Sequence, residues 1–246
     1  MKKTNYSYVG IALIILVFGI LFIPKIVNRI TNNDIIRNES RSNQADNTNS
    51  ESLDLAFLII NGKPKKVPAF SFTNQDGKTI TNKDYDGKVF LVEFFFTTCP
   101  TICPRMSKNL VQIQESFNGF EDFGVASFTI NPDHDTPEVL KQYAEQYGMT
   151  NPNWHLMTGN VEVIYELANT GFNLYTAKDD EVEGGFEHSG NFALIDKNGF
   201  IRSRVMNENP IIFYNGMISE SEKMDEDGQE QQITMLKEDI AKLLKE

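Results

Sequence analysis

The sequence predicts an α/β domain joined to an N-terminal membrane helix. Apolar runs typical of buried strands alternate along the chain with segments whose apolar residues recur at helical spacing, and this alternation indicates the α/β class. An apolar run without charge over residues 9–23 is the observation that adds the membrane helix.

The apolar run at the N-terminus is flanked by positive charges, with Lys2 and Lys3 before it and Lys25 and Arg29 after it. A cleaved signal peptide is the alternative, but no small-x-small cleavage site follows the run, and no cysteine near its end could carry a lipid. We therefore predict a single-span membrane anchor over residues 1–30. Because both flanks are basic, charge alone does not set its orientation.

Residues 31–52 are dominated by Asn, Ser, Arg, Asp and Glu and show no apolar period, which is typical of a flexible linker. Residues 53–246 are then expected to form the folded domain. The chain carries 23 Lys and Arg against 34 Asp and Glu, a formal net charge of -11. Nucleic acid is therefore not an expected partner.

The elements of the domain follow from turn signals and periodicity. Residues 69–72 and 78–81 flank an Asn-Gln-Asp-Gly turn and predict a hairpin. The continuous apolar run 89–96 predicts a central strand, and Pro104 suits the start of the helix that follows. The later elements are predicted as strand 123–130, helix 137–147, strand 154–157, helix 161–168, a hairpin of 192–196 with 200–205, and helix 230–244. This order, hairpin, β-α-β, hairpin, helix, is thioredoxin-like.

The only two cysteines, Cys99 and Cys103, lie where the central strand gives way to the helix. Free N–H groups and the helix dipole favour thiolates at such a position. A disulfide between them would close a loop too short to stabilise the fold by much. A reactive role is therefore favoured over a structural one, and the candidates are dithiol redox catalysis, peroxide reduction and metal binding.

The spacing of the cysteines separates these candidates. Thioredoxin-type oxidoreductases use C-x-x-C, whereas here three residues intervene. A peroxiredoxin-like site would need Thr or Ser three residues before its cysteine, but Phe96 and Pro100 stand there. Both redox interpretations are weakened, and thiol-disulfide oxidoreductase activity remains the alternative.

Histidine favours the metal interpretation. His188 lies in the stretch Gly-Gly-Phe-Glu-His-Ser-Gly before a predicted strand, and its glycines permit a loop that reaches the cysteines. Two thiolates and an imidazole are soft ligands that suit Cu(I), whereas structural zinc normally needs a fourth ligand. His134, in a charged loop, and His155, beside Trp154, are interpreted as structural.

Three stretches of the chain resemble the Sco/SenC family of copper-binding assembly proteins of cytochrome c oxidase. They are CPTICP at 99–104, TINPDHDTP at 129–137 and FEHSGNFALIDKNGF at 186–200. The resemblance implies a thioredoxin-like fold, copper bound by Cys99, Cys103 and His188, and maturation of the binuclear copper centre of an oxidase subunit. It also implies a domain on the periplasmic or extracytoplasmic side of the plasma (inner) membrane, with a copper-accepting oxidase subunit as partner.

The chain departs from the family pattern at several positions. Thr101 and Asn131 stand where the family often has acidic residues, while Asp135 is retained. Asp135 could orient His188, dock a partner, or cap the helix that starts at Pro137. The segment 206–228 is longer than expected of the family, and no function is assigned to it.

Overall fold

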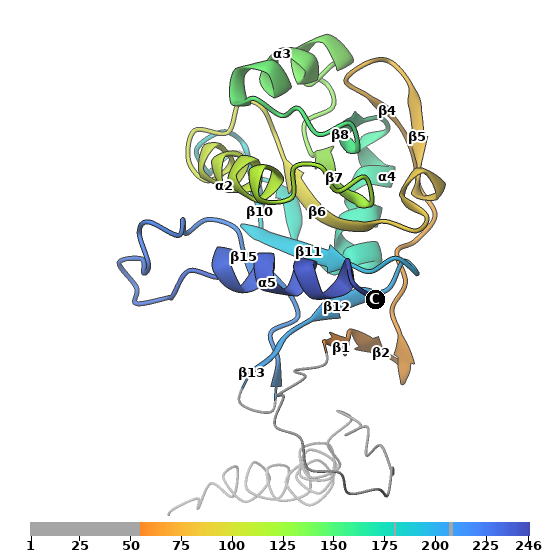
Figure 1. The fold of residues 1–246 in the computed structure, drawn as a ribbon. Coiled ribbons are helices and arrows are strands. Elements are labelled where there is room, and N and C mark those ends of the chain that lie inside the picture. The colour runs from red at the N-terminus through yellow and green to blue at the C-terminus, as the bar shows by residue number, and fades with distance from the viewer. Residues whose placement is uncertain (1–54, 180, 207–208) are drawn as a thin grey trace, which may run out of the picture. The chain divides into compact units, whose positions relative to one another are not determined.

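The computed structural model describes residues 55–179, 181–206 and 209–246, which belong to one compact unit (Figure 1). The predicted anchor (1–30) and linker (31–52) lie outside the described residues. Within the described ranges, no helix is both long and apolar enough to cross a bilayer.

A nine-stranded sheet forms the centre of the domain, with β6, β7 and β8 parallel in its middle and antiparallel strands on either side. Its order is β1-β12-β11-β6-β7-β8-β4-β5, and β15 also pairs with β11. The strands are β1 Ala56–Phe57, β4 Ser71–Asn74, β5 Thr79–Thr81, β6 Val89–Phe95, β7 Phe123–Thr129, β8 Trp154–Thr158, β11 Asn191–Ile195, β12 Ile201–Ser203 and β15 Tyr214–Asn215. All residues of β6 and β7 are buried, as both faces of a central strand require.

Three short hairpins lie outside the main sheet. They are β2 Ile59–Ile60 with β3 Lys63–Pro64, β9 Thr176–Lys178 with β10 Phe186–His188, and β13 Val205–Met206 with β14 Asn209–Pro210. The sequence did not predict them, because strands this short show no readable alternation of apolar and polar residues.

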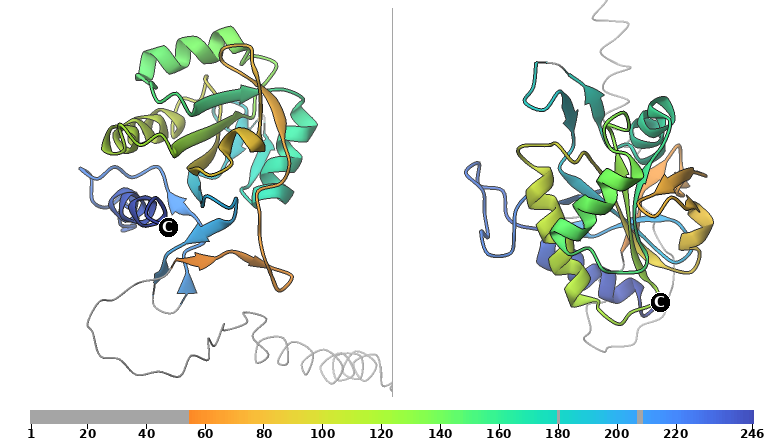
Figure 2. Two further views of the ribbon diagram at one scale, coloured as in Figure 1. Left: turned by 45° about the vertical axis from the view of Figure 1, so that its right-hand side comes forward. Right: turned by 90° about the horizontal axis from the view of Figure 1, so that it is seen from above.

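Helices cover both faces of the sheet (Figure 2). α2 Cys103–Ser116, α3 Pro137–Tyr147 and α5 Ile233–Leu243 lie on one face. α4 Val161–Glu166 and the π-helix η2 Leu167–Phe172 lie on the other, and the 3-10 helix η1 Asn82–Tyr85 precedes β6. Neighbouring side chains of β6 show the two layers, because Phe95 packs on Tyr143 of α3 whereas Phe94 packs on Phe172 of the π-helix.

Most predicted elements are confirmed, with three differences at helix ends. α2 begins at Cys103, one residue before the predicted start at Pro104. The helix predicted over 161–168 changes to π geometry at Leu167. α5 begins at Ile233 and not at 230, because Glu230 forms an antiparallel bridge with Met224.

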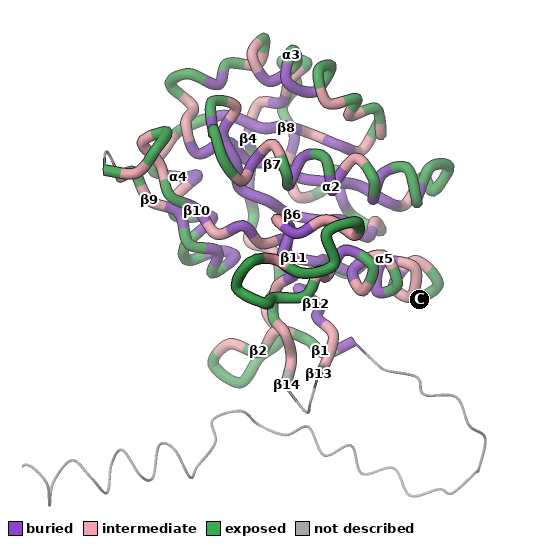
Figure 3. The backbone as a smooth tube through the Cα atoms, turned by 90° about the vertical axis from the view of Figure 1, so that its left-hand side faces the viewer, coloured by how far each residue is buried: buried purple, intermediate pink, exposed green. Residues whose placement is uncertain are grey.

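The polypeptide between β12 and α5 contains the segment to which the sequence assigned no function. It forms β13, β14 and β15, and then a largely exposed loop over residues 219–231. Figure 3 shows that the strands of the main sheet, by contrast, are mostly buried.

Candidate metal centre

The two cysteines lie at the carboxyl end of β6, in the turn that leads into α2. Cys103 is the first residue of α2, and Pro104 follows it in the first turn, where a missing N–H costs no helical hydrogen bond. The N–H of Cys103 instead donates to Sγ of Cys99 at 3.4 Å. The predicted position at a helix N-terminus is confirmed, and both cysteines are free thiols.

His188 reaches the cysteines from a strand. It ends β10 and pairs with Thr176 of β9. Gly184 and Gly185 lie with positive φ in the loop of this hairpin, and Gly184 approaches Pro100 of the cysteine turn, so the predicted glycine loop is confirmed, while His188 itself lies on the strand. The side chain of Asn169, in the π-helix, bonds the backbone of Thr176 in both directions and so fixes β9. The strand therefore gives His188 a defined position.

The hydrogen bonds of His188 select its tautomer. Nδ1 lies 3.2 Å from the carbonyl oxygen of Ser189, and because a carbonyl can only accept, Nδ1 must carry the proton. Nε2 therefore presents its lone pair, and it lies 3.1 Å from Sγ of Cys103. A ligating histidine in proteins is typically held in this way, through its other ring nitrogen. The ring of Phe96 packs edge-on against His188 at 5.9 Å.

The ligand atoms of Cys99, Cys103 and His188 all lie within 4.8 Å of one another. The three residues are 7%, 1% and 8% exposed. Since metal bonds to sulfur and nitrogen are about 2.0–2.3 Å long, one ion can reach all three donors. Among the described residues, no fourth Cys, His, Asp or Glu joins this group. The structure thus brings together the three residues that the sequence predicted as ligands.

Burial and hydrogen bonding separate the two thiols. The hydrogen bond from the thiol of Cys103 is the main cause that lowers the pKa of Cys99 to about 3, and the backbone N–H groups of Cys103 and Thr101 lower it further. Burial and the neighbouring Cys99 thiolate raise the pKa of Cys103 well above its usual range. Without metal, Cys99 is therefore the thiolate, while Cys103 keeps its proton and donates it to the thiolate of Cys99.

Asp135, in the loop between β7 and α3, holds the cysteine turn in place. Its buried carboxylate accepts hydrogen bonds from N–H of Thr97 at 3.0 Å and from the hydroxyls of Thr97 and Thr129. All three earlier interpretations of Asp135 are corrected. It does not cap α3, because the hydroxyl of Thr136 does so. It makes no hydrogen bond to His188, and its carboxylate is too deeply buried to contact a partner protein.

The other two histidines lie away from the donor atoms. The exposed side chain of His134 places Nδ1 2.9 Å from Oδ1 of the buried Asp135. His155 contacts Asn74 and Tyr85 beside the sheet. Sequence reasoning missed Thr97 as a residue that positions the turn. Its only signal was its place directly after a buried strand, which is shared by many residues without function.

The fold and the site define a class: a thioredoxin-like domain in which a C-x-x-x-C dithiol and a distant histidine converge on one point. The family model SCO1/SenC matches residues 60–220, and the chain belongs to this family. The SCO1 protein homolog of Bacillus subtilis (strain 168) is 34% identical over 136 residues, covering 54% of this chain and 70% of that protein.

Solved structures of the family share this fold. A SCO1/SenC family lipoprotein from Bacillus anthracis str. Ames has a TM-score of 0.59 and 30% identity, over 73% of this chain and 95% of that chain. BsSco, a member of the Sco family of cytochrome c oxidase assembly proteins with an identified disulfide switch, has a TM-score of 0.56 and 27% identity, over 74% and 94%. ScoI of Bradyrhizobium japonicum, solved with copper bound, shares the fold at a TM-score of 0.55 and 20% identity, over 72% and 99%.

Proposed function

We propose that this chain is a membrane-anchored copper metallochaperone that carries copper on Cys99, Cys103 and His188 and delivers it to the binuclear centre of cytochrome c oxidase. The observation that carries the proposal is the convergence of three soft donors within 4.8 Å. Family membership and the oxidase-assembly role of BsSco support it.

The donor set fits copper better than structural zinc. Two sulfurs and one imidazole nitrogen suit Cu(I), while a closed zinc site normally has four protein ligands. Three donors leave room for a thiolate or imidazole of an acceptor protein to approach the ion. Such an arrangement favours transfer of copper over storage.

The same dithiol provides a redox switch. Oxidised glutathione can convert Cys99 and Cys103 into a disulfide with each other. The two thiols give up two electrons and two protons, and the glutathione disulfide becomes two reduced glutathione molecules. Neither sulfur then remains a thiolate ligand, so we expect copper binding to be lost. The two sulfur atoms lie within 4.8 Å of each other, so a small movement of the cysteine turn would bring them to bonding distance.

The proposed anchor is the apolar run of residues 9–23, with the domain on the extracytoplasmic side of the plasma (inner) membrane. A tether over residues 31–52 would keep the copper site near membrane-bound acceptors and raise its effective concentration there. Protease added to intact spheroplasts should cleave the domain, and protection of the domain would contradict this topology.

Copper titration tests the site directly. The reduced full chain in mild detergent is titrated anaerobically with Cu(I) in competition with a chromophoric chelator, and we expect one copper per chain. Cys99→Ser, Cys103→Ser and His188→Ala should each weaken binding by more than the roughly 10- to 100-fold loss seen for outer-shell residues. His155→Ala is the matched control, and equal affinities of the two histidine variants would exclude His188 as a ligand.

The delivery role is tested in a deletion strain. Loss of the protein should lower the copper content and activity of a copper-containing terminal oxidase, and added copper should partly restore both. A general thiol-disulfide oxidoreductase would instead change the thiol status of many exported proteins without rescue by copper. Normal oxidase copper together with widespread thiol defects would refute delivery.

A further inference from the structure

The segment between β12 and α5 contacts the turn that follows His188 and the helix that begins at Cys103. Its strand β15 pairs with the start of β11, with Asn215 opposite Asn191 and Tyr214 opposite Phe192. β11 begins directly after the turn that follows His188. The segment therefore lies against the part of the chain that leaves the imidazole.

The peptide groups of Gly216 connect the turn that follows His188 to the helix that begins at Cys103. Its N–H donates to the carbonyl oxygen of Gly190 at 2.8 Å, just beyond His188. Its carbonyl oxygen accepts from Nδ2 of Asn109 at 2.8 Å, and Asn109 is a buried residue of α2, the helix that begins at Cys103. One residue of the segment thus bonds to both sides of the candidate metal centre.

Close packing allows little movement at this junction. A Cβ atom at Gly190 would lie 2.3 Å from Sδ and 2.4 Å from Cγ of Met217. A Cβ atom at Gly216 would lie 2.5 Å from the buried ring of Phe192. A side chain at Gly190 would have to displace Met217, and one at Gly216 would have to displace the ring of Phe192.

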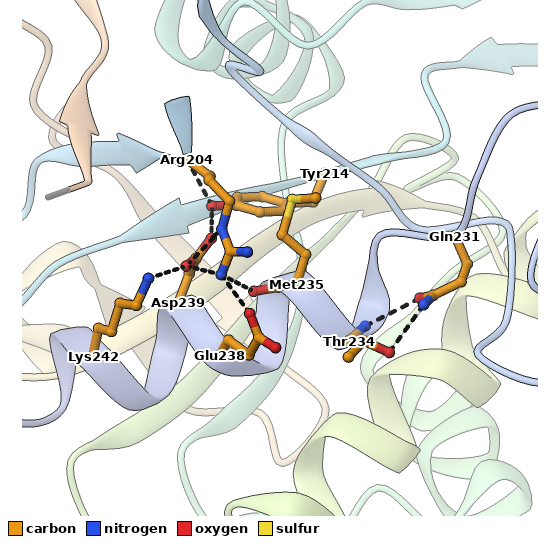
Figure 4. Close-up of polar contacts among 8 residues, drawn as sticks. All are labelled: Arg204, Tyr214, Gln231, Thr234, Met235, Glu238, Asp239 and Lys242. Atoms are coloured by element: carbon orange, nitrogen blue, oxygen red, sulfur yellow. Dashed lines mark hydrogen bonds and ion pairs between the residues drawn. The ribbon is translucent and has the colours of Figure 1, made fainter. Parts of the chain in front are cut away.

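A buried polar network anchors the segment at its start (Figure 4). The hydroxyl of Tyr214 donates to Asp239 of α5 at 2.8 Å, and Asp239 also receives two charged hydrogen bonds from Nε and Nη2 of Arg204, the shortest at 2.6 Å. Tyr214 and Asp239 are both fully buried. β15 is therefore fixed to α5 through the hydroxyl of Tyr214.

We propose that Asn109, Gly190, Gly216 and Met217 form a brace that sets the separation between His188 and the cysteine helix. Asn109 is then a positioning residue for copper binding, while Met217 fills the space beside Gly190. The inference rests on the proposed copper site but assigns a role to a segment outside it. The brace acts on the imidazole relative to the sulfurs, because Cys99 and Cys103 both belong to the turn and helix on one side of the junction.

The test inserts a methyl group at the junction. Gly190→Ala should lower the Cu(I) affinity of the full chain about 10- to 100-fold, the range for residues that orient metal ligands. Adding Met217→Ala to this variant vacates the space and should restore most of the affinity. Met224→Ala, an exposed methionine of the same segment, is the matched control and should leave the affinity unchanged. Asn109→Ala removes the hydrogen bond to the carbonyl of Gly216 and should weaken copper binding severalfold. It provides the test if Gly190→Ala does not fold.

Two further measurements separate positioning from general destabilisation. In a His188→Ala background, Gly190→Ala should cause no additional loss of copper affinity. The equilibrium of the Cys99–Cys103 disulfide with glutathione should be unchanged in Gly190→Ala, since the brace does not act between the two sulfurs.

Wild-type affinity in both Gly190→Ala and Asn109→Ala, or an equal loss with and without His188, would overturn the inference while leaving the copper site intact. Failure of the wild-type chain to bind Cu(I) would refute the proposed function, and the inference with it.

Discussion

The carboxylate of Asp135 is expected to stabilise both the fold and the cysteine turn. Asp135→Asn keeps the shape of the side chain but removes its charge. Charge-assisted hydrogen bonds contribute about 1.5–3 kcal/mol and neutral ones about 0.5–1.5 kcal/mol. Over the bonds from Thr97 N–H and from the hydroxyls of Thr97 and Thr129, the difference amounts to roughly 3 kcal/mol of unfolding free energy.

The assay is thermal unfolding of the metal-free chain followed by circular dichroism. A loss of about 3 kcal/mol corresponds to a melting temperature lower by roughly 6–12 °C for a domain of this size. Asp133→Asn, an exposed residue in the same loop, is the matched control and should change the unfolding free energy by less than about 0.5 kcal/mol. Because Thr97 lies close to Cys99, copper affinity should also fall about tenfold in Asp135→Asn. Equal melting temperatures for the two variants would refute the reasoning.

Further predictions concern buried ionisable groups. Burial raises the pKa of the Glu93 carboxyl group from 4.5 to about 7. Between these two pH values the carboxyl group is protonated in the folded chain and ionised in the unfolded chain. Stability should therefore fall by roughly 3 kcal/mol as the pH rises from about 4.5 to 7, and Glu93→Gln should abolish this slope in urea unfolding. Because the pKa of Cys99 is lowered to about 3, iodoacetamide should alkylate Cys99 before Cys103. The alkylation rate of Cys99 should change less than about twofold between pH 5 and 8, and a tenfold rise per pH unit would contradict this prediction. Arg204→Ala leaves the buried Asp239 without its main partner and should lower the unfolding free energy by roughly 3–5 kcal/mol. Arg105→Ala, at an exposed ion pair, should lower it by less than about 1 kcal/mol, and similar losses for the two variants would argue against the buried network.

The local units of the fold could be predicted from the sequence because each carries its own signal. The run 89–96 is apolar on both faces, and α3 begins at Pro137 and ends at Tyr147 as predicted. The cysteine turn was placed correctly for the same reason, since a buried strand, a proline and a helical period follow one another within a short stretch of chain. The glycine-rich stretch before a predicted strand singled out His188 among the three histidines, and the resemblance to the Sco/SenC family implied that it is a ligand.

Tertiary structure alone decided how the parts of the site are held. The tautomer of His188 depends on the carbonyl of Ser189 and on a strand that pairs with β9. The role of Asp135 depends on Thr97, and the link through Gly216 joins α2 to the chain beyond His188. Apart from the contact of His188 with its neighbour Ser189, these contacts join residues that lie far apart in the sequence, where each partner alone looks like an ordinary loop or surface residue. A window of sequence records the preference of its own residues for helix, strand or turn, whereas a contact between distant residues exists only once the whole chain has packed.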